Sequence, residues 1–128
     1  IVRGDEVHTI EYRAFLAYEA GEYHKAINLF NSVENSEDKY IQFYQALCLL
    51  SVDKTEEAIQ TLRPLTESSP GTLQNMDCRQ KATWYVGLAY LKQGKEQEAM
   101  YYMDILRKQN EELRFKKIEA EEIYELLK

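Results

Sequence analysis

Three turns along this chain share one pattern of neighbouring residues. A small residue lies seven positions before each turn residue, an alanine five positions after it, and a large apolar residue nine positions after it. A pattern that recurs at intervals of tens of residues predicts stacked copies of one structural unit. The three sets are Ala14, Gly21, Ala26 and Phe30; Ala46, Asp53, Ala58 and Leu62; and Gly87, Gly94, Ala99 and Met103.

The residues around these turns have helical spacing. Before the first turn, apolar side chains recur three or four positions apart at Ile10, Ala14, Ala17 and Tyr18, which places them on one face of a helix. The same periodicity continues through the later segments, and it is interrupted by a polar stretch over 34–38 and a turn-rich stretch over 68–71. The sequence therefore predicts an all-α protein made of paired helices.

The length and the spacing of the turns predict the domain organisation. A chain of 128 residues is expected to form a single domain over 1–128. The turn residues lie 32 positions apart between the first two units and 41 apart between the last two. This difference predicts an inserted linker around Pro70–Asp77. We expect helical units at about 7–38, 39–70 and 80–110, with a last helix over about 111–127.

The repeated positions resemble the tetratricopeptide repeat, whose period is about 34 residues. In that family the small residues allow two helices to approach closely, and the large residue fills the space beside them. The third unit matches best, in the run WYVGLAYLKQG over 84–94, whereas the second has Asp53 and Thr55 instead of the usual glycine and aromatic residue. The resemblance covers about 7–110. It implies a right-handed α–α superhelix, a tetratricopeptide-like solenoid of three helix pairs, with a C-terminal capping helix.

The beginning of the chain carries a narrower resemblance. The run Val2–Glu6, together with the third unit, is similar to bacterial tetratricopeptide domains that follow a single membrane-spanning helix. The chain also begins with Ile1 rather than Met, as an excised fragment would. We therefore expect a protein of the bacterial cell envelope, anchored by a segment outside these residues.

In the family, the first helix of each pair lines a concave groove, and this chain has aromatic residues at many matching positions. Tyr and Trp combine a large apolar surface with a polar tip, which suits the binding of a peptide or protein. The alternative is that such side chains pack between helices, and we expect about half of them to do so. The candidate groove residues are Tyr12, Phe15, Tyr18, Tyr40, Phe43, Tyr44, Lys81, Trp84 and Tyr85.

Some members of the family bind a C-terminal carboxylate through basic and amide side chains. The matching positions in this chain are Glu11, Phe15, Tyr44, Lys81 and Tyr85. Only Lys81 keeps the required chemistry, and Glu11 would repel a carboxylate. We therefore expect no carboxylate clamp of that kind.

Charge and motif content exclude several classes of function. The net charge is −6 and the Lys and Arg residues are scattered, so we expect no nucleic-acid partner. No apolar run approaches the roughly 18 residues of a membrane span, so we expect no direct membrane insertion by these residues. His8 and His24 have no further ligand at metal-binding spacing, and no nucleophile pairs with a base. We expect no catalysis, metal or cofactor.

The two cysteines are too few for a disulfide framework. Cys48 lies in the apolar run over 46–50, and we expect it to pack as a small hydrophobic residue. Cys78 is expected near a loop, at the beginning of the third unit.

These observations predict a non-catalytic scaffold that binds a peptide or protein partner through a concave aromatic groove. The alternative is a structural or self-assembly module of a membrane-anchored envelope protein, forming homo-oligomers through an apolar end or face. An enzyme is the weakest hypothesis, because it needs converging acid, base or metal groups that the sequence does not display.

Overall fold

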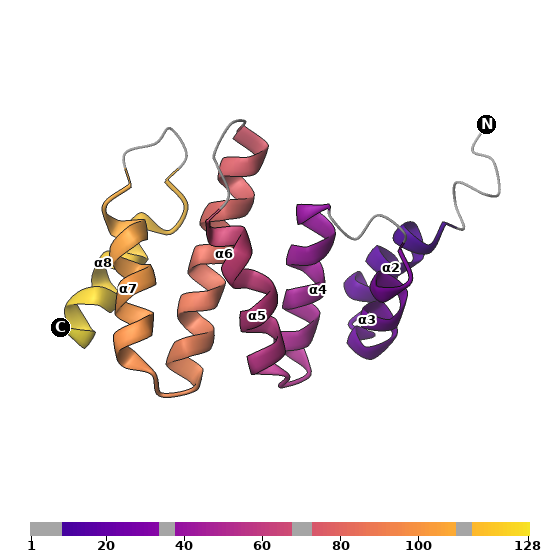
Figure 1. Cartoon of the computed structure of the whole chain (residues 1–128), viewed down its shortest axis with the longest axis horizontal. Coiled ribbons are helices and arrows are strands. Elements are labelled where there is room, and N and C mark those ends of the chain that lie inside the picture. Colours follow the sequence, from indigo (N-terminus) through magenta and orange to yellow (C-terminus); the bar gives the residue numbers. More distant parts are fainter. Residues whose placement is uncertain (1–8, 34–37, 68–72, 110–113) are drawn as a thin grey trace.

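The structure is a computed structural model that describes residues 9–33, 38–67, 73–109 and 114–128. Every regular element in these ranges is an α-helix, and consecutive helices pack against each other along the long axis of the molecule (Figure 1). The prediction of an all-α solenoid of three helix pairs and a C-terminal helix is confirmed. The helices are α2 (Ile10–Glu19), α3 (Tyr23–Asn31), α4 (Lys39–Ser51), α5 (Thr55–Thr66), α6 (Leu73–Lys92), α7 (Glu96–Arg107) and α8 (Lys117–Leu127).

Each helix pair is joined by a turn of the same geometry. The turn residues Gly21, Asp53 and Gly94 have left-handed backbones, with φ of 79°, 63° and 74°. In each turn, the N–H of the next residue donates to a carbonyl five positions earlier, which is the bond that ends a helix in the Schellman motif. The repeat seen in the sequence is therefore a repeat of helix ends. The three bonds join Glu22 to Ala17, Lys54 to Leu49 and Lys95 to Tyr90, each at 2.9 Å.

The small residues of the pattern bring the helices of each pair close together. Gly87 illustrates the close approach, because a Cβ there would lie 2.7 Å from the Cε of Met103 on α7. The large apolar residues Phe30, Leu62 and Met103 are at most 1% exposed and fill the space beside these contacts. The five alanines of the pattern are all 0% exposed: Ala14, Ala26, Ala46, Ala58 and Ala99.

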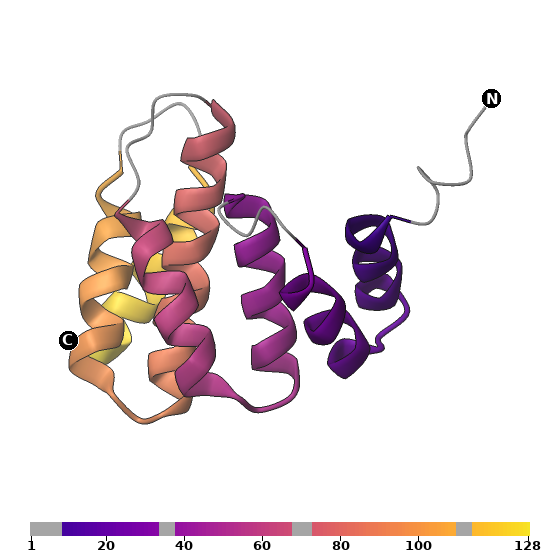
Figure 2. The same ribbon diagram turned by 45° about the vertical axis from the view of Figure 1, so that its right-hand side comes forward.

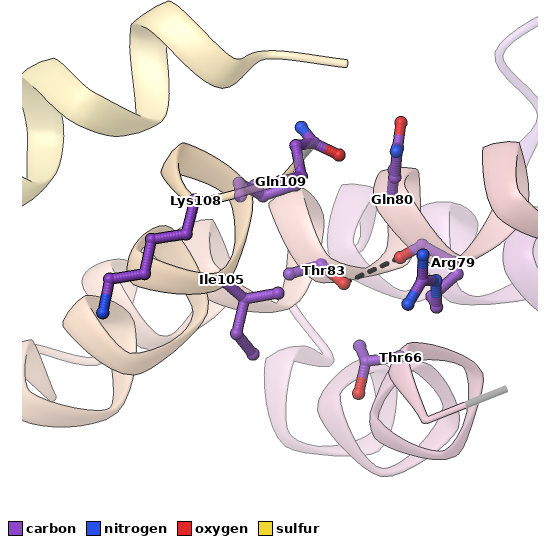
Figure 3. A pocket seen from close by; sticks show the side chains of 8 residues that line it. Thr66, Arg79, Gln80, Thr83, Ile105, Lys108 and Gln109 are labelled. Atoms are coloured by element: carbon purple, nitrogen blue, oxygen red, sulfur yellow. Dashed lines mark hydrogen bonds between the residues drawn. The ribbon is translucent and has the colours of Figure 1, made fainter. Parts of the chain in front are cut away.

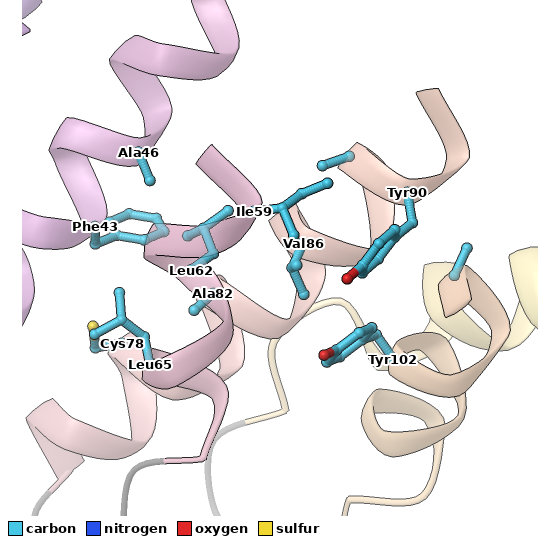
Figure 4. Close-up of a cluster of buried hydrophobic side chains, with 12 residues drawn as sticks. Phe43, Ala46, Ile59, Leu62, Leu65, Cys78, Ala82, Val86, Tyr90 and Tyr102 are labelled. Carbon is cyan, nitrogen blue, oxygen red and sulfur yellow. The ribbon is translucent and has the colours of Figure 1, made fainter. Parts of the chain in front are cut away.

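The buried apolar side chains form three clusters that follow one another along the stack. The first lies between α2, α3, α4 and the beginning of α5, and the last lies between α6, α7 and α8. The central cluster, shown in Figure 4, joins α4 and α5 to α6 and α7 around Leu62, Val86 and Tyr90. Consecutive pairs therefore share a core, as they do in a solenoid. Figure 2 shows the same succession of pairs from another side.

The linker expected around Pro70–Asp77 is wrong for its second half. Leu73–Asp77 form the beginning of α6, which is 20 residues long. No Gly or Pro interrupts 73–77, and an ion pair of 3.1 Å between Asp77 and Lys81 joins successive turns of the helix. The extra residues therefore lengthen α6. The proposed unit limits themselves remain a prediction.

The last helix begins later than expected, at Lys117. Lys116 has a left-handed backbone with φ of 57°, and the N–H of Phe115 donates to the side chain of Gln80 instead of to a helical carbonyl. Both features keep 114–116 out of the helix, while 111–113 lie outside the described residues. The expected position of Cys78 is also wrong: it lies inside α6, is 1% exposed, and has a free thiol. Cys48 is buried and free, as expected of a small hydrophobic residue.

Candidate functional site

Five of the predicted groove residues contact one another in a continuous series, which we call the aromatic row. Phe15 and Tyr18 come from α2, Phe43 and Tyr44 from α4, and Tyr85 from α6. Their rings meet edge to face, at centroid distances of 5.2–5.7 Å and interplanar angles of 61–79°. This geometry is the one that aromatic quadrupoles favour. The row therefore joins the first helices of all three pairs.

Tyr44 is the centre of the aromatic row. Its ring lies 5.3 Å from Phe15, 5.2 Å from Tyr18 and 5.3 Å from Phe43, measured between centroids. It packs against two of the buried clusters at once. Its position is thus fixed from several sides, and it links the first helix pair to the second.

The rings of the row differ in how far they are open to solvent. Phe43 is 3% exposed and belongs to the core, whereas Phe15, Tyr18, Tyr44 and Tyr85 are half-buried. Burial raises the pKa of the Tyr18 phenol, with a smaller contribution from the neighbouring Tyr44. Phe43 is therefore the buried member of the row, and the other four rings are partly accessible to solvent.

Tyr12 continues the pattern at the N-terminal end. Tyr12, Tyr44 and Tyr85 each lie nine positions before their turn residue, so they occupy equivalent positions in the three units. Tyr12 is 44% exposed. A tyrosine therefore recurs at this position in all three units, and the tyrosine of the first unit is the most exposed.

A polar group lies beside the row, where α4 begins. Tyr40 is half-buried in the first turn of α4, and burial together with the charge of Asp77 raises its phenol pKa. Burial opposes the charge of Lys81, but its hydrogen bond and ion pair with Asp77 raise its pKa overall. Lys81 is therefore a neutralised cation.

Trp84 lies apart from the aromatic row. It packs against the cluster formed by Met103, Leu106 and Ala120, which α8 helps to close. The Lys116 ammonium lies 5.6 Å from the centroid of the Trp84 ring, within the range of a cation–π interaction. Trp84 therefore packs at the junction of α7 and α8 and not within the aromatic row.

The sequence did not predict the contribution of Tyr23 from the second helix of the first pair. Its ring lies 6.1 Å from Tyr18 and extends the series of edge contacts to α3. Phe30, also on α3, meets Phe15 at 5.1 Å. The only signal was that both are aromatic, since the expected groove was restricted to the first helices.

A hollow between α5, α6 and α7 was not predicted from the sequence, because its residues come from distant segments. Figure 3 shows Arg79 of α6 and Thr66 of α5 pointing into this cavity of about 560 Å³, while Lys108 extends away from them. The Thr83 hydroxyl donates to the carbonyl of Arg79 at 2.7 Å. The cavity is lined by Thr66, Arg79, Gln80, Thr83, Ile105, Leu106, Lys108 and Gln109.

The described residues offer no arrangement that suggests metal chemistry. Within 9–33, 38–67, 73–109 and 114–128, no group of three His, Cys, Asp or Glu side chains is placed to hold a metal ion. None of the helices in these ranges is both long and apolar enough to cross a membrane. The aromatic row, with its half-buried rings, is suited to contact with another molecule's apolar groups.

Comparison with known proteins identifies the fold. No family model matches the chain, and no curated protein sequence matches it significantly. Among solved structures, the type III secretion translocator chaperone SycD of Yersinia enterocolitica superposes with a TM-score of 0.71 at 14% sequence identity. The match covers 99% of this chain and 86% of that chain. The chain therefore has a tetratricopeptide-like helical-repeat fold similar to that of SycD.

Proposed function

We propose that this chain binds a segment of a partner protein along the aromatic row and catalyses no reaction. The observation that carries the proposal is the series of half-buried rings from α2, α4 and α6. Because each ring is held by its neighbours, little side-chain freedom remains to be lost when a partner binds. Fixed aromatic side chains of this kind contribute strongly to binding at protein interfaces.

The chemistry along the row favours an apolar segment that also offers hydrogen-bonding groups. The equivalent residues Tyr12, Tyr44 and Tyr85 each combine a ring with a hydroxyl. The neighbouring charges, Asp77 and Lys81, neutralise each other at 3.1 Å. A strongly charged tail would find no unpaired counter-charge in this group. We infer an extended or helical segment with apolar side chains spaced to meet successive helix pairs.

The fold likeness to SycD supports the proposal, because SycD is named as a chaperone, and a chaperone binds other proteins. At 14% identity the likeness does not carry over a partner. The bacterial, membrane-anchored setting remains a prediction from the resemblance at Val2–Glu6 and the third unit.

The proposal is tested by comparing two sets of alanine variants in a capture experiment from the source cell. The double variant Tyr12→Ala and Tyr85→Ala removes rings at both ends of the site and keeps Tyr44, the centre of the packing. Tyr101→Ala is the matched control, because Tyr101 is 63% exposed on α7, away from the row. Circular dichroism and urea unfolding must first show that both variants fold.

We expect the double variant to weaken capture of the partner by at least roughly tenfold, the size of effect seen when interface anchors are truncated. The Tyr101→Ala variant should bind as the unaltered chain does. If both variants retain the same partner with the same affinity, the partner does not bind along the row.

A further inference from the structure

The charged side chains beside the aromatic row differ between the first helix pair and the later ones. On α6, Lys81 pairs with Asp77 at 3.1 Å. Lys92, at the end of the same helix, pairs with Asp53 at 2.5 Å. The part of α4 over 40–51 has no charged residue at all. These residues therefore give the α4 and α6 parts of the row no net charge.

The α2 part of the row has two acidic residues beside it. Glu11, Phe15 and Glu19 are four positions apart, so they lie in one line along the helix. Both glutamates are exposed, and the ring between them contacts Tyr44 at a centroid distance of 5.3 Å. Since eight residues of α-helix rise about 12 Å, one glutamate lies about a turn before Phe15 and the other about a turn after it.

No basic residue of the described chain neutralises these two glutamates. Within the four ranges that the structure describes, neither Glu11 nor Glu19 forms an ion pair. Arg13 lies two positions before Phe15, which is about 200° around the helix, so it belongs to nearly the opposite side. The α2 part of the aromatic row therefore has a net negative charge.

The position of Glu19 is not explained by the stability of α2. Glu19 is the last residue of the helix, where the backbone carbonyls carry partial negative charge and disfavour an acidic side chain. No basic residue in the last turn offsets this, and Lys25 of α3 pairs with Glu22 instead, at 4.0 Å. Glu11, by contrast, lies in the first turn, where a carboxylate stabilises the helix. Glu19 is therefore the stronger evidence for a role in binding.

We propose that the partner segment has a basic side chain, Lys or Arg, at the end that meets α2, next to the apolar side chains that meet α4 and α6. The cation pairs with Glu19 and lies beside the rings of Phe15 and Tyr18, where a cation–π interaction adds to the ion pair. Because the charges on α6 are paired, the cation also determines which end of the segment meets α2. This inference rests on the proposed binding along the aromatic row.

Selection from a library of random short peptides displayed on phage tests the proposal without a known partner. The 128-residue chain is the bait, and the peptides kept are those whose binding is lost in the Tyr12→Ala and Tyr85→Ala double variant. We expect these peptides to share apolar residues with a Lys or Arg on one side of them. Selected peptides that lack a basic residue, or that have an acidic one in its place, would overturn the proposal.

Charge reversal at Glu19 measures the contribution of the ion pair. Glu19→Lys should weaken binding of a selected peptide by roughly fivefold at low ionic strength, and high salt should reduce the difference, because the charges are exposed. Replacing the basic residue of the peptide with Glu should restore much of the affinity for that variant. Glu57→Lys, exposed on the second helix α5, makes the same change of charge and should bind as the unaltered chain does.

A stability measurement separates this role from a structural one. Because Glu19 is disfavoured at its position, Glu19→Lys should leave the melting temperature unchanged or raise it. Equal affinity of Glu19→Lys and the unaltered chain, for peptides that still require Tyr12 and Tyr85, would overturn this inference alone. If every selected peptide bound the Tyr12→Ala and Tyr85→Ala double variant as tightly as the unaltered chain, the proposed function itself would be contradicted.

Discussion

The junction between α4 and α6 and the junction between α6 and α8 are built from equivalent positions with different chemistry. Phe43 and Trp84 each lie ten positions before their turn residue, and each packs toward the next first helix of the stack. Phe43 is 3% exposed and lies between the rings of Tyr44 and Tyr85. Trp84 is half-buried beneath Lys116 and beside α8.

Polar and cation–π contacts add to the apolar cluster at the C-terminal junction. Gln80 accepts the N–H of Phe115 at 3.2 Å, and Gln109 donates to the carbonyl of Phe115 at 3.1 Å. The Arg107 guanidinium lies 3.8 Å from the Tyr124 ring centroid and donates to Glu121 at 3.3 Å. Both glutamines are at least nine-tenths buried. These contacts position α8.

The repeat and the type of residue have different effects on a junction between helix pairs. The repeat places a large side chain of each first helix against the next one. The residue at this position decides what surrounds it: other rings, as at Phe43, or a cation and the α8 helix, as at Trp84. A surface for a partner can therefore arise at one junction while the next serves to hold the capping helix.

The largest effect is expected at the ring-based junction. Tyr44→Ala removes three edge-to-face contacts and leaves space between two clusters, so it should lower the free energy of unfolding by about 3 kcal/mol. Tyr44→Phe keeps the ring and should cost less than about 1 kcal/mol. Urea unfolding followed by circular dichroism measures both. Equal losses for the two variants would mean that the hydroxyl, and not the ring packing, holds this junction.

A smaller loss is expected at the polar junction. Gln80→Leu leaves the N–H of Phe115 without its acceptor and should cost about 2 kcal/mol, concentrated in α8. Trp84 is the one tryptophan of the chain, so its fluorescence should shift to the red as α8 loosens. Gln60→Leu, exposed on α5, serves as the control. An unchanged Trp84 spectrum in Gln80→Leu would show that this hydrogen bond does not position α8.

The pH dependence of stability tests the packing at the ring-based junction, because Cys48 lies in the cluster behind the aromatic row. Burial raises the pKa of its thiol from 9.0 to about 11. Above pH 9 the unfolded chain loses this proton while the folded chain retains it, so the free energy of unfolding falls as the pH rises towards 11. Below pH 9 the thiol contributes no pH dependence.

Comparison with Cys48→Ala isolates this effect from the tyrosines and lysines that titrate in the same range. The difference in unfolding free energy between the two proteins should be constant below pH 9 and should change by about 2 kcal/mol by pH 11. A difference that stays constant throughout would show that the thiol is not desolvated in the folded state.

The smallest effects are expected at the turns. Gly94→Ala forces a Cβ into the left-handed region and should cost about 1 kcal/mol. Asp53→Gly relieves the same strain but removes the ion pair of 2.5 Å between Asp53 and Lys92, so the two changes should largely cancel. Thermal unfolding measures both variants. A large loss of stability in Asp53→Gly would mean that contact between neighbouring turns matters more than the backbone conformation.

The fold was predictable because the repeat marks the helix ends directly. Gly21 and Gly94 predict left-handed turns, and alanines at fixed distances from the turn residues predict close helix contacts. The limits of α6 and α8 were not predictable in the same way. The late beginning of α8 depends on Gln80, which lies 35 positions before the Phe115 backbone that it holds. No local sequence pattern predicts a contact between residues so far apart in the chain.

The candidate site was predictable in its composition and less so in its arrangement. Helical register predicted that Phe15, Tyr44 and Tyr85 lie on the first helices of the pairs. In the structure, these rings form one series that includes Phe43. Register alone could not place Trp84 under α8, because that depends on the path of the chain after α7. It also could not show that Asp77 would neutralise Lys81, since 73–77 were expected to form a linker.

Site-specific photo-crosslinking in the source cell can show whether a partner segment lies along the aromatic row. A benzophenone amino acid replaces Tyr12 in one variant and Tyr101 in another, both at exposed tyrosines. The Tyr12 variant should crosslink to one defined protein, and the Tyr101 variant should not. Crosslinking of the same protein at Tyr101 with none at Tyr12 would contradict this expectation and would place the partner on α7.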